Sequence, residues 1–201
     1  MLDRLRGSLS KVLGSMGLTA SKVLPSPTAW TLIGLLFSVL AFIYYSGGQP
    51  FAAGLMVILS GFFDVLDGAV ARATGKTSPR GAFLDSTLDR VSELLIYLGI
   101  LLGSYTSPLF VLLALAFSLL VSYTRAKGDA LGVNLAGIGI GERSERLVVL
   151  IVTSLLSIVV VGVLIVVVIA FLTIIHRTIK VSSALGRAQK AAAMAQTPAS
   201  P

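Results

Sequence analysis

The chain has 201 residues, of which 55% are hydrophobic and 12% charged, and its mean hydropathy is +0.93. A soluble domain has roughly a quarter of its residues charged, so the composition excludes an ordinary soluble enzyme and indicates one integral-membrane domain. The absence of cysteine excludes disulfides, thiolate nucleophiles and cysteine-ligated metals. The net charge of +7 lies in polar loops and tails, so we expect anionic lipid headgroups as partners and no nucleic acid.

The first 20 residues predict an amphipathic helix that lies on the membrane surface, ahead of the main domain. Apolar residues such as Leu5 and Leu13 recur at helical spacing against Arg4 and Lys11. A helix with one apolar and one basic face binds the interface and does not cross the bilayer. These residues contain no uninterrupted apolar run, so a signal peptide is not expected.

Apolar runs separated by short polar turns predict the membrane-spanning helices, each of which needs about 20 mostly apolar residues. The longest polar segment, residues 124–146, is followed by a final apolar run over residues 147–175. That run is long for one span and short for two. The first four spans are expected near residues 28–45, from residue 51 into an aspartate-rich stretch, from the polar turn at 74–81 through residue 102, and at 109–123.

The placement of basic residues decides the number of spans. Lys and Arg prefer the cytoplasmic side of short loops. The basic N-terminus, the turn at 74–81 and the segment 124–146 fall on one side, whereas the turns at 47–50 and 103–108 carry no charge. Two final spans, with a turn near residues 157–162, put the basic C-terminal segment on the same side as these loops.

The sequence therefore predicts an all-α membrane protein with six transmembrane helices and an interfacial N-terminal helix. We expect residues 21–180 to form the domain and residues 181–201 a partly disordered cytoplasmic tail. Both termini are expected on the cytoplasmic face of the cell membrane. Trp30 and the pair Tyr44–Tyr45 are expected at the membrane–water interface, where aromatic side chains gather.

Four aspartates stand in or beside the predicted second and third spans. Asp64 and Asp67 are three residues apart, and Asp85 and Asp89 are four apart, so each pair shares one face of a helix. If the two helices form an antiparallel hairpin about the turn near Lys76, all four carboxylates lie at a similar depth. The hairpin therefore predicts that the carboxylates converge near the cytoplasmic end.

Converging carboxylates in a partly dehydrated site need compensation for their charge. Shared protons, basic side chains or divalent cations would each supply it, and oxygen ligands of this kind suit Mg²⁺ or Mn²⁺. The alternative is that the aspartates are helix caps at a solvated boundary. Four carboxylates at this spacing favour a functional site, because ionisable residues within membrane segments are usually functional.

The same stretch resembles the signature of the CDP-alcohol phosphotransferase family, D-x2-D-G-x2-A-R-x8-G-x3-D-x3-D. Every fixed position and every interval is present. The resemblance implies the six-helix fold, a homodimer and a reaction in which a CDP-linked lipid gives its phosphoryl-bearing group to an alcohol while CMP leaves. The matching residues are Asp64, Asp67, Gly68, Ala71, Arg72, Gly81, Asp85 and Asp89.

The resemblance also implies a role for each matching residue. Asp64, Asp67 and Asp85 would bind Mg²⁺ or Mn²⁺, as two ions, and Asp89 would be both a ligand and the general base on the acceptor hydroxyl. A looser likeness of PTAWT to the start of the family's first helix adds Thr31. The residues that would border the cytidine and its phosphates are Thr31, Gly68, Ala71, Arg72 and Gly81.

The second polar segment points to the acceptor. YTRAKGDALG followed by GERSER is similar to the phosphatidylinositol-phosphate synthase branch of the family. Several Lys and Arg residues suit a phosphomonoester, so inositol phosphate is the expected acceptor. Glycerol 3-phosphate is the alternative, and positive-inside topology alone is a third explanation. The residues expected to hold the acceptor phosphate are Arg125, Lys127, Arg143, Arg146 and Arg177.

Two functions of other classes also place carboxylates in a membrane. A cation-coupled transporter would do so, but the charges cluster at one end of a hairpin and no inverted repeat is visible. A Mg²⁺-dependent membrane prenyltransferase would need two aspartate-rich motifs and more helices. Release of CMP from a CDP-lipid separates both from a phosphotransferase.

Overall fold

The structure is a computed structural model that describes residues 2–196, with side chains described for residues 12–189. Seven helices and no strand occur in this part of the chain. Their bounds are α1 Leu2–Val23, α2 Pro27–Ser46, α3 Pro50–Ala73, α4 Pro79–Leu102, α5 Pro108–Ala130, α6 Arg143–Leu155 and α7 Val159–Gln196.

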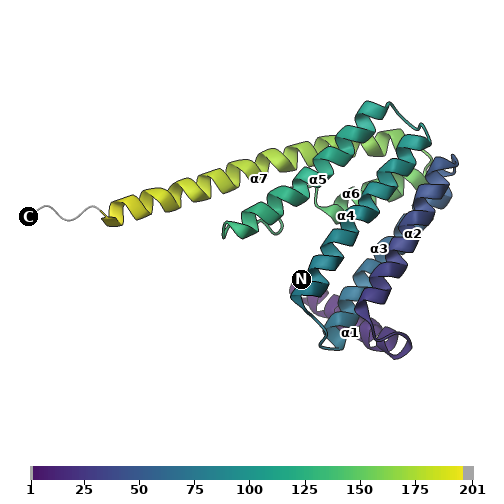
Figure 1. Cartoon of the computed structure of the whole chain (residues 1–201), viewed down its shortest axis with the longest axis horizontal. Coiled ribbons are helices and arrows are strands. Elements are labelled where there is room, and N and C mark those ends of the chain that lie inside the picture. Colours follow the sequence, from purple (N-terminus) through teal and green to yellow (C-terminus); the bar gives the residue numbers. More distant parts are fainter. Residues whose placement is uncertain (1, 197–201) are drawn as a thin grey trace, which may run out of the picture.

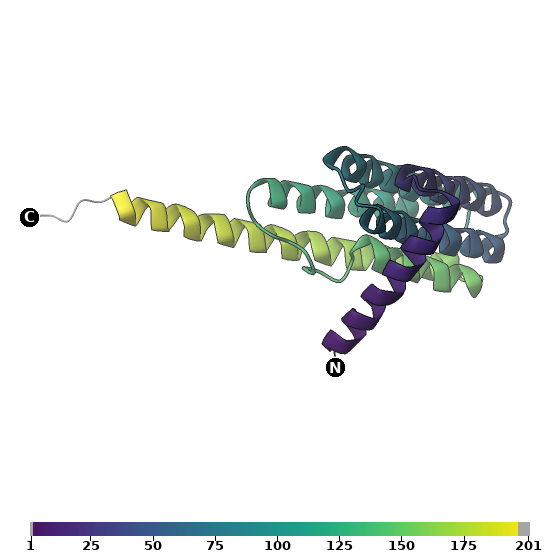
Figure 2. The same ribbon diagram turned by 90° about the horizontal axis from the view of Figure 1, so that it is seen from below.

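The helices form one bundle with α1 laid across one end (Figures 1 and 2). Helix α2 packs against both α3 and α4, α5 packs against α4 and α7, and α6 lies between α3 and α7. The C-terminal part of α7 runs out beyond the bundle (Figure 1). Helices α3 and α4 are consecutive, run in opposite directions (Figure 1) and both pack against α2, so the turn between them brings their aspartates to the same end.

Proline residues set the starts of the four helices α2 to α5. Each of these helices has proline in its first turn, where the missing N–H costs no intrahelical hydrogen bond. Helix α4 has a further cap, since the Ser78 hydroxyl accepts a hydrogen bond from the Gly81 N–H at 3.1 Å. The sequence therefore specifies where the hairpin of α3 and α4 turns.

The predicted break in the last apolar run is confirmed, because α6 ends at Leu155 and α7 begins at Val159. Ser157 lies in the left-handed region, with φ of 56°, and the N–H of Ile158 donates to the carbonyl of Thr153 at 2.8 Å. Gly162 then allows the first turn of α7 to contact Thr153. A tight turn thus reverses the chain within an apolar run.

Among the described residues, four helices (α2, α3, α5 and α7) are long and apolar enough to cross a membrane. Side chains such as Leu36, Leu112 and Val168 are more than half exposed, as expected of surfaces that face lipid. Helix α4 carries several charged residues, and α6 has 13 residues, about 20 Å at 1.5 Å per residue. The structure therefore supports a helical membrane protein, and the count of six spans stays a prediction.

The apolar core lies at the end of the bundle away from α1. It includes Tyr45 and Tyr97, which are fully buried, together with residues of α5, α6 and α7. Tyr45 is buried within the bundle and has no surface to offer to lipid headgroups, and its depth in a membrane stays a prediction. Its hydroxyl instead forms a hydrogen bond with the Ser154 hydroxyl at 2.5 Å, so burial is compensated inside the bundle.

Helix α1 is tied to the end of the bundle that holds the aspartates. A Cβ on Gly17 would lie 2.5 Å from the carbonyl oxygen of Ala69, so the backbones of α1 and α3 are in close contact there. The Lys76 ammonium, in the turn after α3, donates to the carbonyl of Pro25 at 2.9 Å. The predicted N-terminal helix is confirmed as a helix, and its place on a membrane surface stays a prediction.

Helix α7 continues past the expected domain boundary at residue 180 and ends at Gln196. The described part of the expected tail is therefore helical. Residues 197–201 lie outside the described residues, and the division into three segments stays a prediction.

Candidate active site

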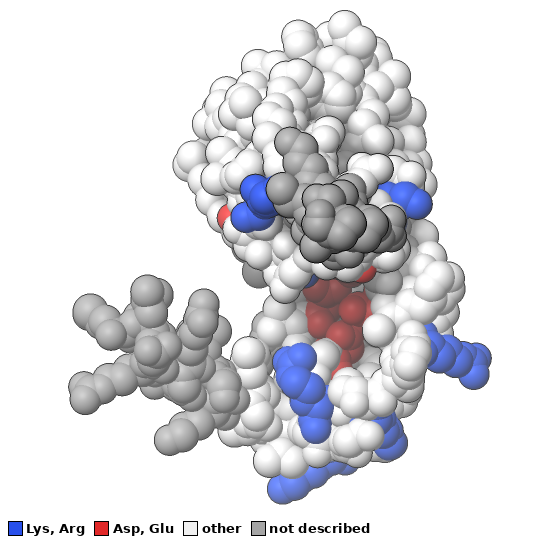
Figure 3. All heavy atoms as spheres, turned by 90° about the vertical axis from the view of Figure 1, so that its left-hand side faces the viewer, with Lys and Arg blue, Asp and Glu red and all other residues white. Residues whose placement is uncertain are grey.

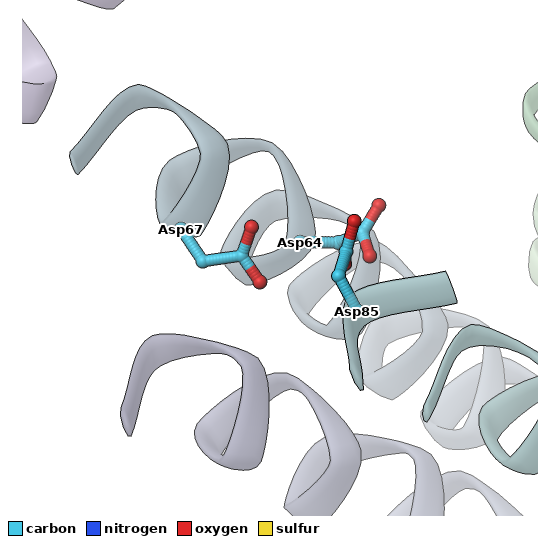
Figure 4. Close-up of side chains that lie close together, drawn as sticks. All are labelled: Asp64, Asp67 and Asp85. Atoms are coloured by element: carbon cyan, nitrogen blue, oxygen red, sulfur yellow. The ribbon is translucent and has the colours of Figure 1, made fainter. Parts of the chain in front are cut away.

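Three of the four aspartates that were predicted to converge form one cluster. Asp64 and Asp67 lie on α3 and Asp85 lies on α4, and one carboxylate oxygen from each lies within 4.8 Å of the others. The three side chains point toward one another (Figure 4). Acidic side chains gather in a hollow of the surface, with Lys and Arg side chains farther out around it (Figure 3). We call Asp64, Asp67 and Asp85 the acidic cluster.

Asp89 lies one helical turn beyond Asp85 and meets a basic side chain. Nη1 of Arg143, at the start of α6, lies 2.7 Å from Oδ1 of Asp89 and 3.0 Å from Oδ2 of Asp64. Arg90 contacts the other oxygen of Asp89 at 3.3 Å. Basic side chains, one of the three expected forms of compensation, therefore neutralise Asp64 and Asp89.

The acidic cluster has the donor set for a divalent cation. Asp67 is 5% exposed, and its Oδ2 is buried without a hydrogen-bond partner. An unpaired buried carboxylate oxygen is costly, and a metal ion would supply the missing partner. All the available donors are carboxylate oxygens, which suit Mg²⁺ and Mn²⁺ and suit softer metals poorly. The residues present therefore fit a divalent metal.

A pocket of about 350 Å³ opens beside the acidic cluster, between the first turn of α2 and the hairpin of α3 and α4. Asp67 and Asp85 form part of its wall. A Cβ on Gly68 would lie 3.2 Å from Nη1 of Arg72, so glycine leaves the guanidinium room to face the pocket. All five residues predicted for the nucleotide lie on its lining: Thr31, Gly68, Ala71, Arg72 and Gly81.

The five basic residues predicted for the acceptor phosphate do not form one cluster. Of these five, only Arg143 contacts the aspartates. Arg125 has a side chain that is 45% exposed and lies 3.6 Å from Glu142. Lys127 lines a separate pocket of about 350 Å³ between α5 and α7. The structure thus places Arg125 and Lys127 at the surface of the α5–α7 side.

Arg146 and Arg177 are buried and their hydrogen bonds are made within the protein. Arg146 donates two hydrogen bonds to Oε1 of Glu93, at 3.0 and 2.6 Å, and a third to the carbonyl of Gly141. Arg177 donates to the carbonyls of Val121 and Ile138, and Nη2 lies 3.1 Å from Glu142. In this structure Arg146 therefore joins a backbone segment to the buried Glu93, and Arg177 joins two backbone segments to Glu142, whose side chain is 28% exposed.

Sequence reasoning missed Glu93 and Glu142, which pair with these arginines. Glu93 is 2% exposed and lies four residues after Asp89 on the same face of α4. An acidic residue within an apolar helix was the available signal. Glu142 precedes α6, and its N–H donates to the Glu145 side chain at 2.8 Å, a helix-capping arrangement that the spacing in GERSER could have indicated.

The fold and the site together define a helical membrane protein with a carboxylate cluster that fits a divalent cation, beside a pocket whose lining includes Arg72 and Lys76. A model of the CDP-alcohol phosphatidyltransferase family matches residues 24–175. The chain belongs to this family of membrane transferases.

Several similar proteins are synthases of inositol phosphate lipids. Archaetidylinositol phosphate synthase of Pyrococcus horikoshii is 36% identical, over 92% of this chain and 98% of that protein. Phosphatidylinositol phosphate synthase of Streptomyces avermitilis is 39% identical over 64% of this chain and 56% of that protein. The crystal structure of Mycobacterium tuberculosis phosphatidylinositol phosphate synthase with CDP-DAG bound has a TM-score of 0.76 and 28% identity, covering 85% of this chain and 94% of that one.

Proposed function

We propose that the protein transfers the phosphatidyl-type group of a CDP-linked lipid, CDP-diacylglycerol or CDP-archaeol, to inositol phosphate and releases CMP. The observation that carries the proposal is the contact of Arg143 with Asp64 and Asp89. This contact places the Arg143 guanidinium, which suits an acceptor phosphate, next to the acidic cluster. The pocket beside that cluster is the one predicted for the nucleotide, and we call it the nucleotide pocket. The names of the relatives, archaetidylinositol and phosphatidylinositol phosphate synthases, support the same acceptor.

The donor would bind with its cytidine and diphosphate in the pocket beside the acidic cluster. Thr31, Gly68, Ala71, Arg72 and Gly81 would surround it, and the apolar surfaces of the helices would receive the lipid chains. A related structure has CDP-DAG bound, which supports a CDP-lipid donor. Because Val, Leu and Ile side chains accept acyl and isoprenoid chains alike, both CDP-lipids are offered in the test of the reaction.

The acidic cluster, with Asp89, would hold Mg²⁺ or Mn²⁺, as two ions. Bound there, the cations supply charge neutralisation for the donor diphosphate and for the leaving CMP. A related structure contains manganese and citrate, which supports a divalent metal site. The buried, unpaired Oδ2 of Asp67 is this chain's own support for a ligand at that position.

Asp89 would act as the general base of the transfer. The acceptor hydroxyl oxygen attacks the phosphorus that carries the lipid, the bond from that phosphorus to the oxygen of CMP breaks, and the hydroxyl proton passes to Asp89. In the structure, Asp89 is 15% exposed and lies between Arg90 and Arg143. The acceptor would displace part of this contact as it binds.

Arg143 would hold the phosphate of the acceptor next to that base. Its Nε is buried without a hydrogen-bond partner, so the guanidinium has donor capacity beyond its contacts with the aspartates. A phosphomonoester carries nearly two negative charges and accepts paired hydrogen bonds from such a planar group. Free inositol has no charge and would gain little from this arginine. The exposed Arg125 and Lys127 would attract the acceptor phosphate at the entrance to the site, and the buried Arg146 and Arg177 would support the segment that carries Arg143.

We further propose that α2 to α7 all cross the membrane, that both termini and the active site face the cytoplasm, and that the chain forms a homodimer. Positive charge at the aspartate end supports the orientation, since Lys76, Arg80 and Arg125 all lie there.

A cysteine at Lys76 or Ser183 should react with an impermeant thiol reagent in inverted vesicles, and one at Gly48 only from outside. Labelling of position 183 from outside would show that α6 and α7 do not both cross. Cross-linking in intact membranes tests the dimer.

The reaction is tested with membranes that contain the protein and each CDP-lipid. Inositol phosphate, free inositol and glycerol 3-phosphate are offered separately, and products are identified by mass spectrometry with CMP measured in parallel. The proposal predicts turnover with inositol phosphate and loss of turnover in chelator. Equal use of glycerol 3-phosphate or of free inositol would overturn the acceptor, and release of diphosphate from a prenyl donor would overturn the reaction.

A further inference from the structure

We infer that the buried pair Glu93–Arg146 is a positioning device that holds Arg143 against Asp89, and that it acts on acceptor binding through Arg143 alone. The inference rests on the proposed function, since it gives Arg143 its role toward the acceptor. Both Glu93 and Arg146 are almost fully buried, at 2% and 0% exposure, so neither is open to a soluble substrate.

The two helices present matching contacts on successive turns. On α4, Glu93 follows Asp89 by four residues, and on α6, Arg146 follows Arg143 by three, so each pair of residues shares a helical face. Asp89 contacts Arg143 and Glu93 contacts Arg146. Within the described residues, these two contacts are the ion pairs that join α4 to α6. The buried contact, Glu93–Arg146, therefore fixes the position of α6 along α4, and this position brings Arg143 to Asp89. We call Glu93–Arg146 the deeper contact and Asp89–Arg143 the outer contact.

The geometry of the deeper contact makes it a rigid reference. Nε and Nη2 of Arg146 both donate to Oε1 of Glu93, at 3.0 and 2.6 Å, and Nη1 donates to the carbonyl of Gly141 at 2.6 Å. One guanidinium thus holds α4 and the backbone two residues before Arg143. A planar group with three fixed donors sets both position and rotation, which a lysine would not do.

Helix α7 fixes the same segment from the other side. A Cβ on Gly141 would lie 2.8 Å from the carbonyl oxygen of Ile169, so the backbones touch there. Arg177 pairs with Glu142 at 3.1 Å, the residue directly before Arg143. Arg143 is therefore the first helical residue after a segment that is held on two sides, and its side chain starts from a fixed point.

A buried ion pair seldom adds net stability, because desolvation of the two charges offsets their attraction. Two apolar residues in place of Glu93 and Arg146 would fill the same space equally well. The hydrogen bonds of a charged pair are directional, so they can fix the position of a third residue, here Arg143. This role explains why two charges are kept inside a membrane domain. The unpaired Oε2 of Glu93 fits this explanation, since the carboxylate is not arranged for maximal stability.

The test is a double-mutant cycle between the pair and Arg143. The first variant replaces both partners, Glu93→Gln with Arg146→Gln, so that no uncompensated charge is left in the core. The second is Arg143→Ala, and the third combines all three changes. For each, kcat, the KM of CDP-lipid, the KM of the acceptor and equilibrium binding of inositol phosphate to the purified protein are measured.

The pair variant should weaken inositol phosphate by about ten- to a hundredfold in KM and in binding, with the KM of CDP-lipid within about threefold of the unmutated protein. In the Arg143→Ala background the same changes should have no further effect on the acceptor. Arg146→Lys, which keeps the charge and loses the planar fork, should fall between the pair variant and the unmutated protein.

Tyr97→Phe is the matched control. Tyr97 lies four residues after Glu93 on α4, is fully buried and hydrogen-bonds to the Ser118 hydroxyl of α5 at 3.1 Å. It should lower the melting temperature without changing the acceptor KM. The inference would be overturned if the acceptor KM of the combined variant rose by the product of the two separate increases. An acceptor KM that stays unchanged in the pair variant would overturn it too.

The outcome is separable from that of the proposed function. If the unmutated enzyme does not use inositol phosphate, the acceptor assignment fails, and the cycle is run with the acceptor that the enzyme does use. Loss of coupling with that acceptor would then reject the positioning role on its own.

Discussion

The two sides of the active site are built in different ways. The acidic side comes from one hairpin, where Asp64, Asp67, Asp85 and Asp89 lie within 26 residues of one another. On the basic side, Arg143 of α6 meets Asp64 across 79 residues of sequence, and the predicted basic residues of α5 and α7 make their contacts elsewhere. Helical spacing and one turn suffice to bring the carboxylates together, whereas the place of each arginine depends on how three helices pack.

This difference separates chemistry from recognition. The acidic side would hold the metal and carry the proton transfer, which every member of a phosphotransferase family needs. The basic side would select the acceptor. A change on the acidic side should therefore affect kcat with any acceptor, and a change on the basic side should affect KM for one acceptor. The following predictions test that division, from the largest expected effect to the smallest.

Asp67→Asn tests the metal site directly. Loss of one ligand removes several kcal/mol of transition-state stabilisation, so kcat should fall by about a thousandfold or more. Calorimetric titration with Mn²⁺ should show weakened binding in the same variant. Normal cation binding and activity would remove the acidic cluster from the mechanism.

Asp89→Asn tests the general base. Loss of the base should lower kcat by about 10² to 10⁴, because the acceptor hydroxyl must then lose its proton without a positioned carboxylate. Binding of CDP-lipid should be largely retained, since Asp89 lies outside the lining of the nucleotide pocket. Equilibrium binding and single-turnover kinetics measure the two effects separately, and full turnover would reject the role.

Arg143→Ala should raise the KM of inositol phosphate by about ten- to a hundredfold, the value of one charge-assisted hydrogen bond of about 1.5–3 kcal/mol. Lys127→Ala, on the separate α5–α7 pocket, should raise it less. Steady-state kinetics with both substrates give the comparison. A larger effect of Lys127 would place the acceptor on the other pocket.

Gly17→Val tests whether α1 supports the nucleotide pocket. Its Cβ would meet the carbonyl oxygen of Ala69, the residue after Gly68, so α1 must move away from α3. Such overpacking costs about 1–3 kcal/mol. A thermal melt should show the loss of stability, and the KM of CDP-lipid should rise more than that of the acceptor. Gly14→Ala is the control, because nothing lies within 4 Å of a Cβ there.

Arg90→Ala should have the smallest effect, although Arg90 contacts Asp89. Its side chain is 35% exposed and the distance is 3.3 Å, and an ion pair at such a site contributes about 0.2–1 kcal/mol. Turnover should change by no more than about fivefold. A loss as large as that of Asp89→Asn would show that Arg90 takes part in the reaction.

The sequence by itself determined the hairpin, the acidic cluster and the wall that the hairpin gives to the pocket beside it. The intervals among Asp64, Gly68, Gly81 and Asp85 are local, so helical geometry and a polar turn place them with no knowledge of the remaining helices. The break between α6 and α7 was also predictable, because the distribution of positive charge required it and Ser157 takes the turn there.

The tertiary structure alone decided which basic residues face the aspartates. A basic residue near the end of a helix can face many directions, because the sequence does not fix the rotation of the helix about its axis. Arg143 and Arg146 are only one turn apart on α6, yet Arg143 contacts the aspartates and Arg146 is buried against Glu93. Burial then assigned Arg146 to Glu93 and Arg177 to Glu142, because a guanidinium removed from solvent must find partners within the protein. Tyr45 became part of the core for the same reason, since Ser154 lies within reach of its hydroxyl.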